Sequence, residues 1–418
     1  KGGTATTLSS AVTHTRAGNA TMVDSDGLLK WAPHNLFKSS ENYNINGWYR
    51  TQCTVTPNND IAPDGTTTAN LVSATDGSAS YLMDDGTAFT ALGNYTIKFW
   101  AKANTGDSTL RILVWMLGGS AGSSGLTTFN LTNEWQLLEI NATITTVGAA
   151  RIRIDQPTAG ASSFYLWGAH AYRSDLGGMV NNPSQSTGFE TYVPTTSSVV
   201  YAPRVGHHVY NGSAWVSEGV LHESEARTNL LPISTTLASW SKLNVNASLS
   251  TVTSPSGNQD AVLVKPTAGT HSFTFLWYTT QYNTGVITSI SVFAKASGKD
   301  FMTMCNSSGS TNYASFNLST GAVSNVTANY TANIEDYGNG WYRCSVVTPT
   351  GFNERAIFAV ADANNSATST ANGEDGILLY SPQLEVGSTP SSYIPTSGSQ
   401  VTRAAETLTV PAANLPYS

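Results

Sequence analysis

The chain of 418 residues contains an internal repeat, so its fold must include two similar units that follow one another in the sequence. The copies begin 192 positions apart (240 − 48 = 192), and the offset then changes to 193 and finally to 201. An offset that drifts in this way indicates loops of different length between matched strands. The matched pairs are Trp48 and Trp240, Pro63 and Pro255, Leu71 and Leu263, WAKA at Trp100 and FAKA at Phe293, and TYVPTT and SYIPTS around Tyr192 and Tyr393.

The pentapeptide NGWYR occurs at Asn46 and again at Asn339, which raises the question of a duplicated site. The two copies are 293 residues apart (339 − 46 = 293), far from the repeat spacing, so we predict that they are not equivalent. By order along the repeat, Trp341 corresponds instead to Trp135. We interpret each pentapeptide as an Asn-Gly turn followed by a strand whose tryptophan begins the inward face.

A shorter repeat of an arginine, a hairpin and the first strand of the next domain divides the chain. It begins with HTRAG at His14, APRVG at Ala202 and VTRAA at Val401, and its Asn211-Gly212 is a strong hairpin signal. We therefore expect an N-terminal hairpin segment (1–34), domain A (35–196), a hairpin linker (197–228), domain B (229–397) and a tail that opens a further linker (398–418). The third opening favours more chain beyond the tail. The start, KGGTATTL, has neither Met nor a leader pattern, which indicates a processed or truncated beginning.

The hydrophobic period inside each domain is two, with β-branched and aromatic enrichment and frequent Gly, Asn, Asp and Ser between the apolar runs. In RIRID, for example, Ile152 and Ile154 point one way and the charged residues point the other. No stretch carries an apolar stripe at helical spacing. The sequence therefore predicts an all-β fold, two tandem antiparallel β-sandwich (jelly-roll) domains joined by β-hairpin linkers, with a closed barrel as the alternative.

Composition argues against several partners. Charged residues make up 11% of the chain, with 20 Lys and Arg against 27 Asp and Glu, and no basic run suits nucleic acid. No apolar run reaches the roughly 18 residues that a membrane helix needs. Cys53, Cys305 and Cys344 lack the spacing of a zinc site, and we expect free thiols, although Cys305 and Cys344 could pair. We expect no nucleic acid, no membrane and no cofactor.

Three strands of domain A offer a candidate binding surface. Tyr95, Ile97 and Phe99 alternate with outward residues, as do Leu110 and Ile112 in the next strand. If these strands and RIRID belong to one sheet, its outer surface combines aromatic rings with basic side chains. A sugar ring can stack its apolar face on an aromatic ring while basic groups reach its hydroxyls or carboxylates, so this surface favours acidic polysaccharides. The predicted carbohydrate-binding residues are Trp100, Trp115, Lys98, Lys102, Arg111, Arg151 and Arg153 in domain A, and Trp277, Tyr278 and Phe293 in domain B. The alternative is that these rings pack beneath a loop, another domain or another subunit.

Signals for catalysis or metal binding are weak, and we predict neither. Acidic pairs such as Asp84-Asp85 lie beside turn glycines, where solvated loop carboxylates are expected, with a structural Ca²⁺ site as the alternative. His207, His208, His222 and Glu223 cluster in the linker, where a hairpin that packs against its domain is expected rather than a metal site. No nucleophile, metalloprotease or phosphate-binding motif occurs in a supporting context.

Several segments resemble a module of tailed-bacteriophage virion proteins, especially tail-fibre and other adsorption proteins with carbohydrate-binding-module-like jelly rolls. In domain B these are FNLSTGAV at Phe316, IEDYGNGWYRCSV at Ile334 and LLYSPQLEVGSTPSSYIPTSGSQVTRAAETL at Leu378, preceded by RTNLLPIS at Arg227. Domain A matches more loosely, through APDGTTTANLV, FWAKA, FYLWGAHA and TYVPTT, and departs from the pattern at NEWQLLEI. The resemblance implies an extracellular virion component without a cofactor, usually oligomeric.

From these observations we expect a non-enzymatic fibre, spike or decoration protein on the virion surface that binds host cell-surface glycan for adsorption. Its expected partners are other virion proteins, host polysaccharide and further copies of itself. The first alternative is a purely structural virion subunit that binds no glycan. The second is a polysaccharide depolymerase, which would need two carboxylates in a cleft.

Overall fold

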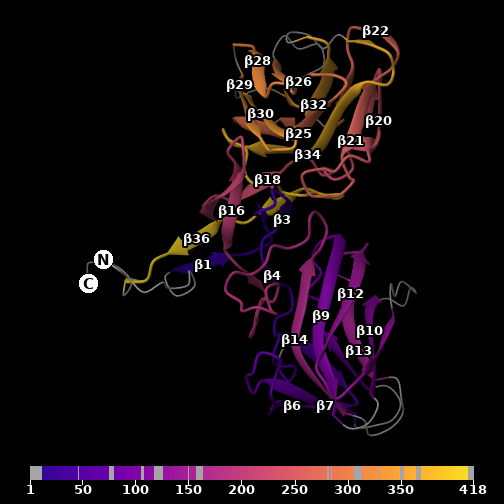
Figure 1. Cartoon of the computed structure of the whole chain (residues 1–418), viewed down its shortest axis with the longest axis vertical. Coiled ribbons are helices and arrows are strands. Elements are labelled where there is room, and N and C mark those ends of the chain that lie inside the picture. Colours follow the sequence, from indigo (N-terminus) through magenta and orange to yellow (C-terminus); the bar gives the residue numbers. More distant parts are fainter. Residues whose placement is uncertain are drawn as a thin grey trace. The chain divides into compact units, whose positions relative to one another are not determined.

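The computed structural model confirms the all-β prediction (Figure 1). It describes residues 12–45, 47–74, 80–104, 108–116, 126–148, 150–156, 163–279, 282–283, 285–305, 313–328, 330–348, 353–363 and 369–412. In these ranges the only helix is the short 3₁₀ turn η1 (Leu237–Ser239). The chain forms two compact units, one built on Trp31–Pro203 and the other on His14–Lys30 together with Arg204–Thr409.

Domain A is a sandwich of two five-stranded antiparallel sheets. Sheet 1 has the order β11 (Thr127–Leu131), β10 (Ser108–Met116), β13 (Ala150–Gln156), β8 (Ser80–Asp84) and β5 (Trp48–Thr51). Sheet 2 has the order β12 (Gln136–Ile144), β9 (Gly93–Ala103), β14 (Ser163–Arg173), β7 (Ala69–Ala74) and β6 (Cys53–Asp60). The short strands β4 (His34–Asn35) and β15 (Val200–Tyr201) pair beside them.

Domain B repeats this plan with six strands in each sheet. Sheet 3 has the order β19 (Ser241–Leu243), β23 (Phe275–Trp277), β32 (Ile357–Ala361), β26 (Phe301–Cys305), β27 (Tyr313–Asn317) and β28 (Ala322–Val326). Sheet 4 has the order β20 (Val245–Leu249), β21 (Val262–Pro266), β34 (Gly376–Val386), β25 (Thr288–Ser297), β30 (Tyr342–Thr348) and β29 (Thr331–Asp336). Two small pairs complete it, β22 (Gly269–His271) with β33 (Ser369–Ala371) and β24 (Tyr282–Asn283) with β31 (Asn353–Glu354).

The segments of the short repeat form four further strand pairs, which are β1 (Thr13–Arg16) with β36 (Glu406–Thr409), β2 (Thr21–Val23) with β3 (Leu29–Trp31), β16 (Arg204–Tyr210) with β17 (Trp215–Leu221), and β18 (Arg227–Asn229) with β35 (Val401–Arg403). The hairpin predicted at Asn211-Gly212 is confirmed, because Tyr210 pairs with Trp215 across it. We call His14–Lys30 arm 1 and Arg204–Leu221 arm 2. Both arms belong to the same compact unit as domain B.

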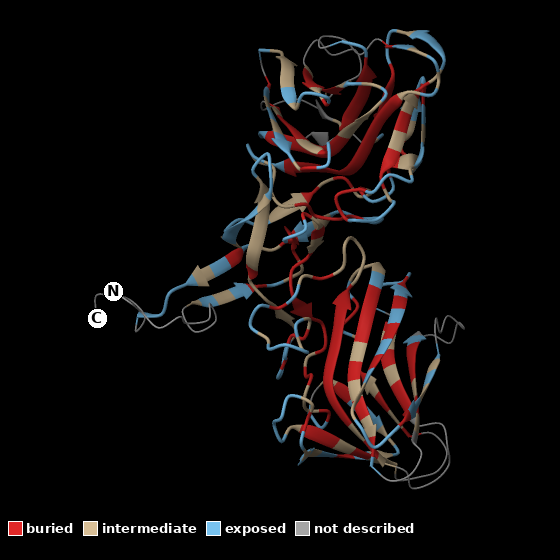
Figure 2. Cartoon of the chain, viewed as in Figure 1, coloured by how far each residue is buried: buried red, intermediate tan, exposed pale blue. Residues whose placement is uncertain are grey.

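The predicted alternation of side chains is confirmed where it was clearest. Tyr95, Ile97 and Phe99 of β9 are at most 1% exposed and belong to the core between sheets 1 and 2. Leu110 and Ile112 of β10 face the same core from the other sheet. Figure 2 shows that β14 and β34 are buried along nearly their whole length. Each sandwich therefore buries its own core.

A buried asparagine ties together the first and last segments of each sandwich. The Asn35 amide donates to the carbonyl oxygens of Ala169 and Val193, at 2.9 and 2.8 Å. In domain B, the Asn229 amide donates to the Ile394 carbonyl at 2.9 Å. A buried polar group is stable only with its hydrogen bonds satisfied. The repeated motifs around these positions are thus explained by closure of the sandwich.

The equivalence predicted for two tryptophans is also confirmed. The Trp135 indole donates to the Ile61 carbonyl at 3.1 Å, and the Trp341 indole donates to the Thr253 carbonyl at 3.0 Å. The two acceptors are separated by the repeat spacing (253 − 61 = 192). Trp48 lies instead in the core of domain A. Asn46 lies outside the described residues, and the two NGWYR copies occupy different places in their domains.

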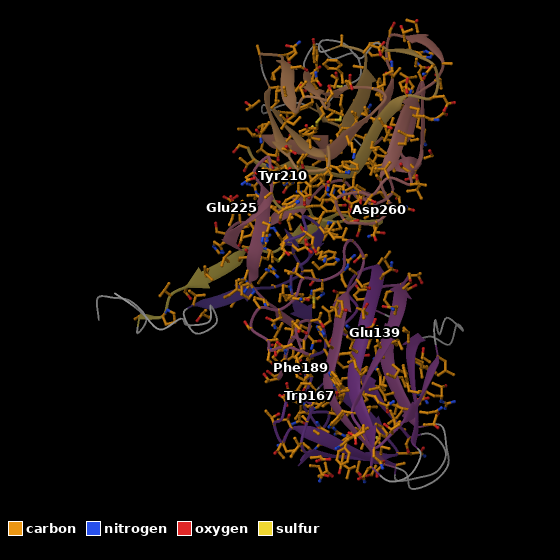
Figure 3. The ribbon with its side chains drawn as sticks, in the orientation of Figure 1. Glu139, Trp167, Phe189, Tyr210, Glu225 and Asp260 are labelled. Carbon is orange, nitrogen blue, oxygen red and sulfur yellow. The ribbon has the colours of Figure 1, made fainter. Side chains whose placement is uncertain are left out.

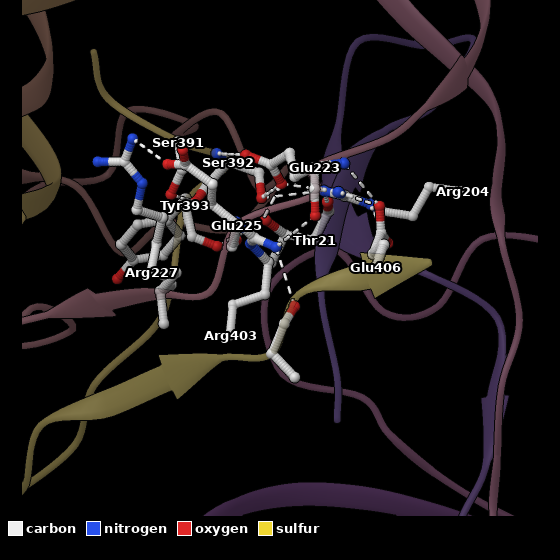
Figure 4. A network of polar contacts seen from close by, with 12 residues as sticks. Thr21, Arg204, Glu223, Glu225, Arg227, Ser391, Ser392, Tyr393, Arg403 and Glu406 are labelled. Carbon is white, nitrogen blue, oxygen red and sulfur yellow. Dashed lines mark hydrogen bonds and ion pairs between the residues drawn. The ribbon is translucent and has the colours of Figure 1, made fainter. Parts of the chain in front are cut away.

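The three arginines of the short repeat meet in one buried network, of which Figure 4 shows Arg204 and Arg403. Arg16 and Arg204 both donate to the carboxylate of Glu406, and Arg204 does so with two nitrogens, at 3.0 and 2.9 Å. Arg204 and Arg403 pair with Glu223, at 2.7 and 3.1 Å. The side chain of Arg204 is 0% exposed. Arms 1 and 2 and the tail strand β36 are therefore joined by ion pairs that water does not reach.

Candidate functional site

The predicted binding residues of domain A divide between two sheets. Strands β10 and β13 pair in sheet 1, with Trp115 opposite Arg151, but β9 belongs to sheet 2. The expected single surface is therefore wrong, because alternation shows which way a side chain points but not which strands pair. Two separate outer faces result. The arginine face of sheet 1 carries Trp115, Arg111, Arg151, Arg153, Tyr49 and Tyr81, and the aromatic face of sheet 2 carries Lys98, Trp100, Lys102, Trp135, Tyr165 and Phe189.

The aromatic face is built from rings of strands β9 and β14 and of two loops, one directly before β12 and one after β14. Trp100 and Phe189 are half-buried, with ring centroids 5.9 Å apart. The buried ring of Trp167 packs against Phe189, with ring centroids 5.7 Å apart, and the two side chains lie close together in Figure 3. Trp135 and Tyr165 are half-buried in the same cluster. The face therefore presents several rings that are held in place by packing and remain partly exposed to solvent.

Polar groups lie among these rings. The Lys102 ammonium is 5.0 Å from the centroid of Trp135 and 5.1 Å from that of Tyr165. It also donates to Asp60 at 2.7 Å, and this hydrogen bond lowers the pKa of that carboxyl. Cation–π contacts and an ion pair together fix the long lysine side chain. The face thus offers a donor and an acceptor between two aromatic rings.

Lys98 lies two residues before Trp100 on the same face and pairs with Glu139 at 3.2 Å. Burial opposes its charge, but Tyr172 and Glu139 outweigh burial and raise the pKa of Lys98. Across from Trp100, Leu137 is 46% exposed and extends the apolar surface.

The arginine face stacks guanidinium groups on rings. Arg153 lies 4.0 Å from the centroid of Tyr81 and 5.2 Å from that of Trp115, which is 40% exposed. Arg151 lies 5.3 Å from the centroid of Tyr49, which is 52% exposed. Planar stacking of this kind holds a guanidinium in place while its N–H groups stay available in the plane.

The candidates of domain B are less accessible. Trp277 is half-buried against Phe275 at 5.1 Å, and Tyr278 packs on the core tryptophan Trp240 at 5.4 Å. Phe293 is 3% exposed and lies 4.8 Å from Tyr337. Its assignment to a surface site is therefore wrong, because a covered ring cannot stack on a sugar.

Arms 1 and 2 provide this cover. The Trp215 ring of arm 2 lies 5.0 Å from Tyr337. Gly27 of arm 1 has a φ of +79°, and a Cβ there would lie 2.0 Å from the Trp215 ring, so only glycine fits. The Leu29 amide donates to the Pro255 carbonyl at 2.8 Å. The outer face of sheet 4, which corresponds to the aromatic face of sheet 2, is thus closed by the arms.

Sequence reasoning missed five residues of the two faces, which are Tyr49, Tyr81, Trp135, Tyr165 and Phe189. The sequence did carry one signal for Phe189. The separation between matched positions of the two domains is 213 at Trp167 and Tyr380 (380 − 167 = 213) but only 201 at Tyr192 and Tyr393 (393 − 192 = 201). Domain A therefore has a 12-residue insertion at this point, and Phe189 belongs to it. Such an insertion beside an aromatic strand is a reasonable place to look for a binding loop.

The acidic and histidine clusters have structural surroundings. Asp84 is 2% exposed, so its interpretation as a solvated loop carboxylate is wrong, and burial raises its pKa to about 7. His207 accepts a hydrogen bond from the Val23 amide at 3.2 Å, which joins the two arms.

Cys305 and Cys344 lie in different sheets. Among the described residues, no group of three or more His, Cys, Asp or Glu could hold a metal ion, and no helix could span a membrane.

Comparison with known proteins gives only distant similarities. No protein-family model matches the chain, and no curated protein matches it. Among solved structures, one described as "CBM4 structure and function" is 18% identical, covers 33% of this chain and 97% of its own, and has a TM-score of 0.25. The N-terminal cellulose-binding domain of Cellulomonas fimi beta-1,4-glucanase C is 21% identical, with coverage of 30% and 88% and a TM-score of 0.24. The enzymatically active domain of tailspike protein 4 from bacteriophage CBA120 is 20% identical, with coverage of 32% and 20% and a TM-score of 0.26. TM-scores this low carry no argument about what this chain binds.

Proposed function

We propose that this chain is a non-enzymatic virion protein that binds host cell-surface glycan through the aromatic face of domain A. The observation that carries the proposal is the group of half-buried rings around the ion pair of Lys102 and Asp60. In the matching face of domain B, Phe293 and Trp341 are each 3% exposed. The sandwich therefore does not need this face to stay open, and its opening in domain A suits a ligand.

The chemistry of this face suits a sugar. A pyranose has an apolar face of C–H groups that packs on an aromatic ring, and ring contacts contribute about 0.5–1.5 kcal/mol each. Lys102 can donate to sugar hydroxyls and Asp60 can accept from them. Because the rings are held by Trp167 and Tyr192 beneath, little conformational entropy is lost on binding.

The virion location rests on the resemblance of domain B and its tail to phage adsorption modules, and it is part of the proposal. Several copies on one particle would convert weak single contacts into strong attachment. The proposed partners are other virion proteins and further copies of this chain.

A binding experiment tests the proposal. The full chain is applied to an array of bacterial surface polysaccharides and neutral oligosaccharides, and release of reducing ends is measured in parallel. We expect saturable binding that falls at least tenfold in the Trp100→Ala, Trp135→Ala double variant, with no reducing ends released. Phe273→Ala, which removes a 42% exposed ring of domain B, is the control and should bind as the parent does.

Two outcomes would overturn the proposal. Absence of binding to every glycan would support a purely structural virion subunit, and release of reducing ends would indicate a depolymerase. Thermal unfolding of each variant must match that of the parent, so that lost binding is not a loss of fold.

A further inference from the structure

We propose that the arginine face of domain A is a second, separate binding site and that its ligand is a polysaccharide that carries carboxylate groups. This site lies on sheet 1, whereas the proposed glycan surface lies on sheet 2. The inference therefore goes beyond the proposed function and does not depend on it.

The arginine face carries more positive than negative charge. The buried Asp84, whose pKa burial raises to about 7, interacts with Arg151, and the other two guanidinium groups, those of Arg111 and Arg153, share one carboxylate, that of Asp155. Arg153 pairs with it closely, and Arg111 reaches it at only 3.8 Å. Among the described residues, no side chain forms an ion pair or hydrogen bond with the guanidinium of Arg151, whose Nε is buried. A cluster of positive charge that the protein compensates only in part favours an anion from outside.

The arginine side chains are also preorganised for binding. Arg153 is held between Tyr81 and Trp115, and Arg151 lies against Tyr49. A guanidinium that is already stacked loses less freedom when it binds, and its planar fork matches both oxygens of a carboxylate. Isolated surface arginines lack this support.

Domain B has the same pair of strands without the arginines, because β32 and β26 correspond to β13 and β10 and pair in the same way. The fully buried Ala150 begins β13, and the fully buried Ala356 directly precedes β32. In domain B, the outward positions of these strands carry no charge, and they are Phe301, Thr303, Cys305, Ile357, Ala359 and Ala361. The sandwich therefore folds without arginines at these positions, so stability of the fold does not account for them.

The chemistry of the ligand follows from the mixture of groups. The exposed ring of Trp115 offers an apolar surface for a sugar face, and the guanidinium groups offer paired donors for carboxylates. Arg151 and Arg153 are two positions apart on one strand, which places them about 6.6 Å apart along it. A polymer with a carboxylate on each sugar can form ion pairs with both arginines, whereas a neutral glycan cannot.

The test uses polygalacturonate as the probe and its fully methyl-esterified form as the uncharged match. We expect the full chain to bind polygalacturonate, to ignore the ester, and to lose affinity as salt rises. The Arg151→Gln, Arg153→Gln double variant should bind at least tenfold more weakly. The Lys265→Gln, Lys299→Gln variant removes two positive charges from domain B and should bind as the parent does.

Further variants separate this inference from loss of fold and from the proposed function. Arg151→Gln alone breaks no ion pair or hydrogen bond to a described residue and removes only the contact of the guanidinium with the exposed Tyr49 ring, so it should weaken binding while the unfolding temperature changes little. Trp100→Ala should leave polygalacturonate binding unchanged. Equal binding of the ester, or unchanged binding by both arginine variants, would overturn the inference. Equally tight binding of polyphosphate, lost in the same variants, would overturn the assignment to carboxylates.

Discussion

The outer faces of sheets 2 and 4 occupy the same place in two copies of one domain, yet one is half-open and the other is closed. In domain B, Trp215 of arm 2 packs on Tyr337, and Tyr337 packs on Phe293 of sheet 4. In sheet 2, Trp100 and Trp135 keep part of their surface. The difference teaches that an aromatic residue at a repeated position can serve packing in one copy and remain available in the other. Exposure, rather than residue type, separates the two roles.

Breaking the arm network is expected to have the largest effect, because it should open the closed face of domain B. Glu406→Gln leaves Arg16 and Arg204 buried beside a neutral amide, which costs about 3–5 kcal/mol. Hydrogen exchange should show loss of protection in both arms and around Tyr337, while the core strands of domain A stay protected. Glu374→Gln, at an exposed ion pair with Lys265, is the control and should change stability by less than about 1 kcal/mol. Unchanged protection of the arms in Glu406→Gln would contradict the assigned role of the network.

The next largest effect is expected from removing the matched rings Phe293 and Trp100, one in each domain. Phe293→Ala should lower the free energy of unfolding of domain B by about 3–5 kcal/mol, because it leaves a cavity beneath the arms. Trp100→Ala should cost domain A only about 1–2 kcal/mol, because its ring is already half-exposed. Chemical denaturation followed by hydrogen exchange in each domain measures both. Equal costs in the two domains would remove the distinction between an open and a closed face.

Acid should loosen the closed face. Burial, with smaller contributions from Arg204 and His208, lowers the pKa of His207 to about 4. An unfolded histidine takes up its proton near pH 6.5, so between these values the unfolded state binds more protons and stability falls as pH falls. We expect arm 2 to lose on the order of 3 kcal/mol between pH 7 and pH 4.

The His207→Asn variant tests this cause. Its amide oxygen can still accept from the Val23 amide but does not titrate, so the pH dependence of arm protection should be smaller. Burial also lowers the pKa of His170 in domain A, to about 3, so the measurement must be made on each domain separately. Identical pH profiles for the parent and His207→Asn would show that other groups control the arms.

The smallest effect on stability is expected at the open face. Lys102→Met breaks a partly exposed ion pair with Asp60, and such pairs contribute about 0–1 kcal/mol. Glycan affinity should fall about fivefold, which corresponds to roughly 1 kcal/mol. Calorimetric titration and thermal unfolding of the same sample measure both quantities. A large loss of stability with unchanged affinity would make Lys102 a packing residue.

The sequence allowed reliable prediction wherever a pattern is local. The period of two places Ile97 and Phe99 in the core, and the order of motifs along the repeat correctly matches Trp135 with Trp341. Strand pairing could not be predicted, because it depends on contacts between distant segments. The separation of Trp100 from Trp115 on different sheets is the result.

The burial of Phe293 was equally hidden from sequence reasoning. Its own strand pattern does not reveal that Trp215, 78 positions earlier (293 − 215 = 78), helps to cover that face. The arginine face was predicted in part, since Arg151 and Arg153 alternate with core residues. Their stacking partners Tyr49 and Tyr81 come from strands whose neighbours in the sheet only the structure identifies.

The arm network also sets an order in time. Arg204 leaves the ribosome about 200 residues before Glu406 (406 − 204 = 202), which at a synthesis rate of about 5–20 residues per second is a delay of roughly 10–40 seconds. During that delay the strands of domain A are complete and can pair, but Arg16 and Arg204 lack the carboxylate of Glu406. The arm network can therefore form only after the strands of both sandwiches have been synthesised.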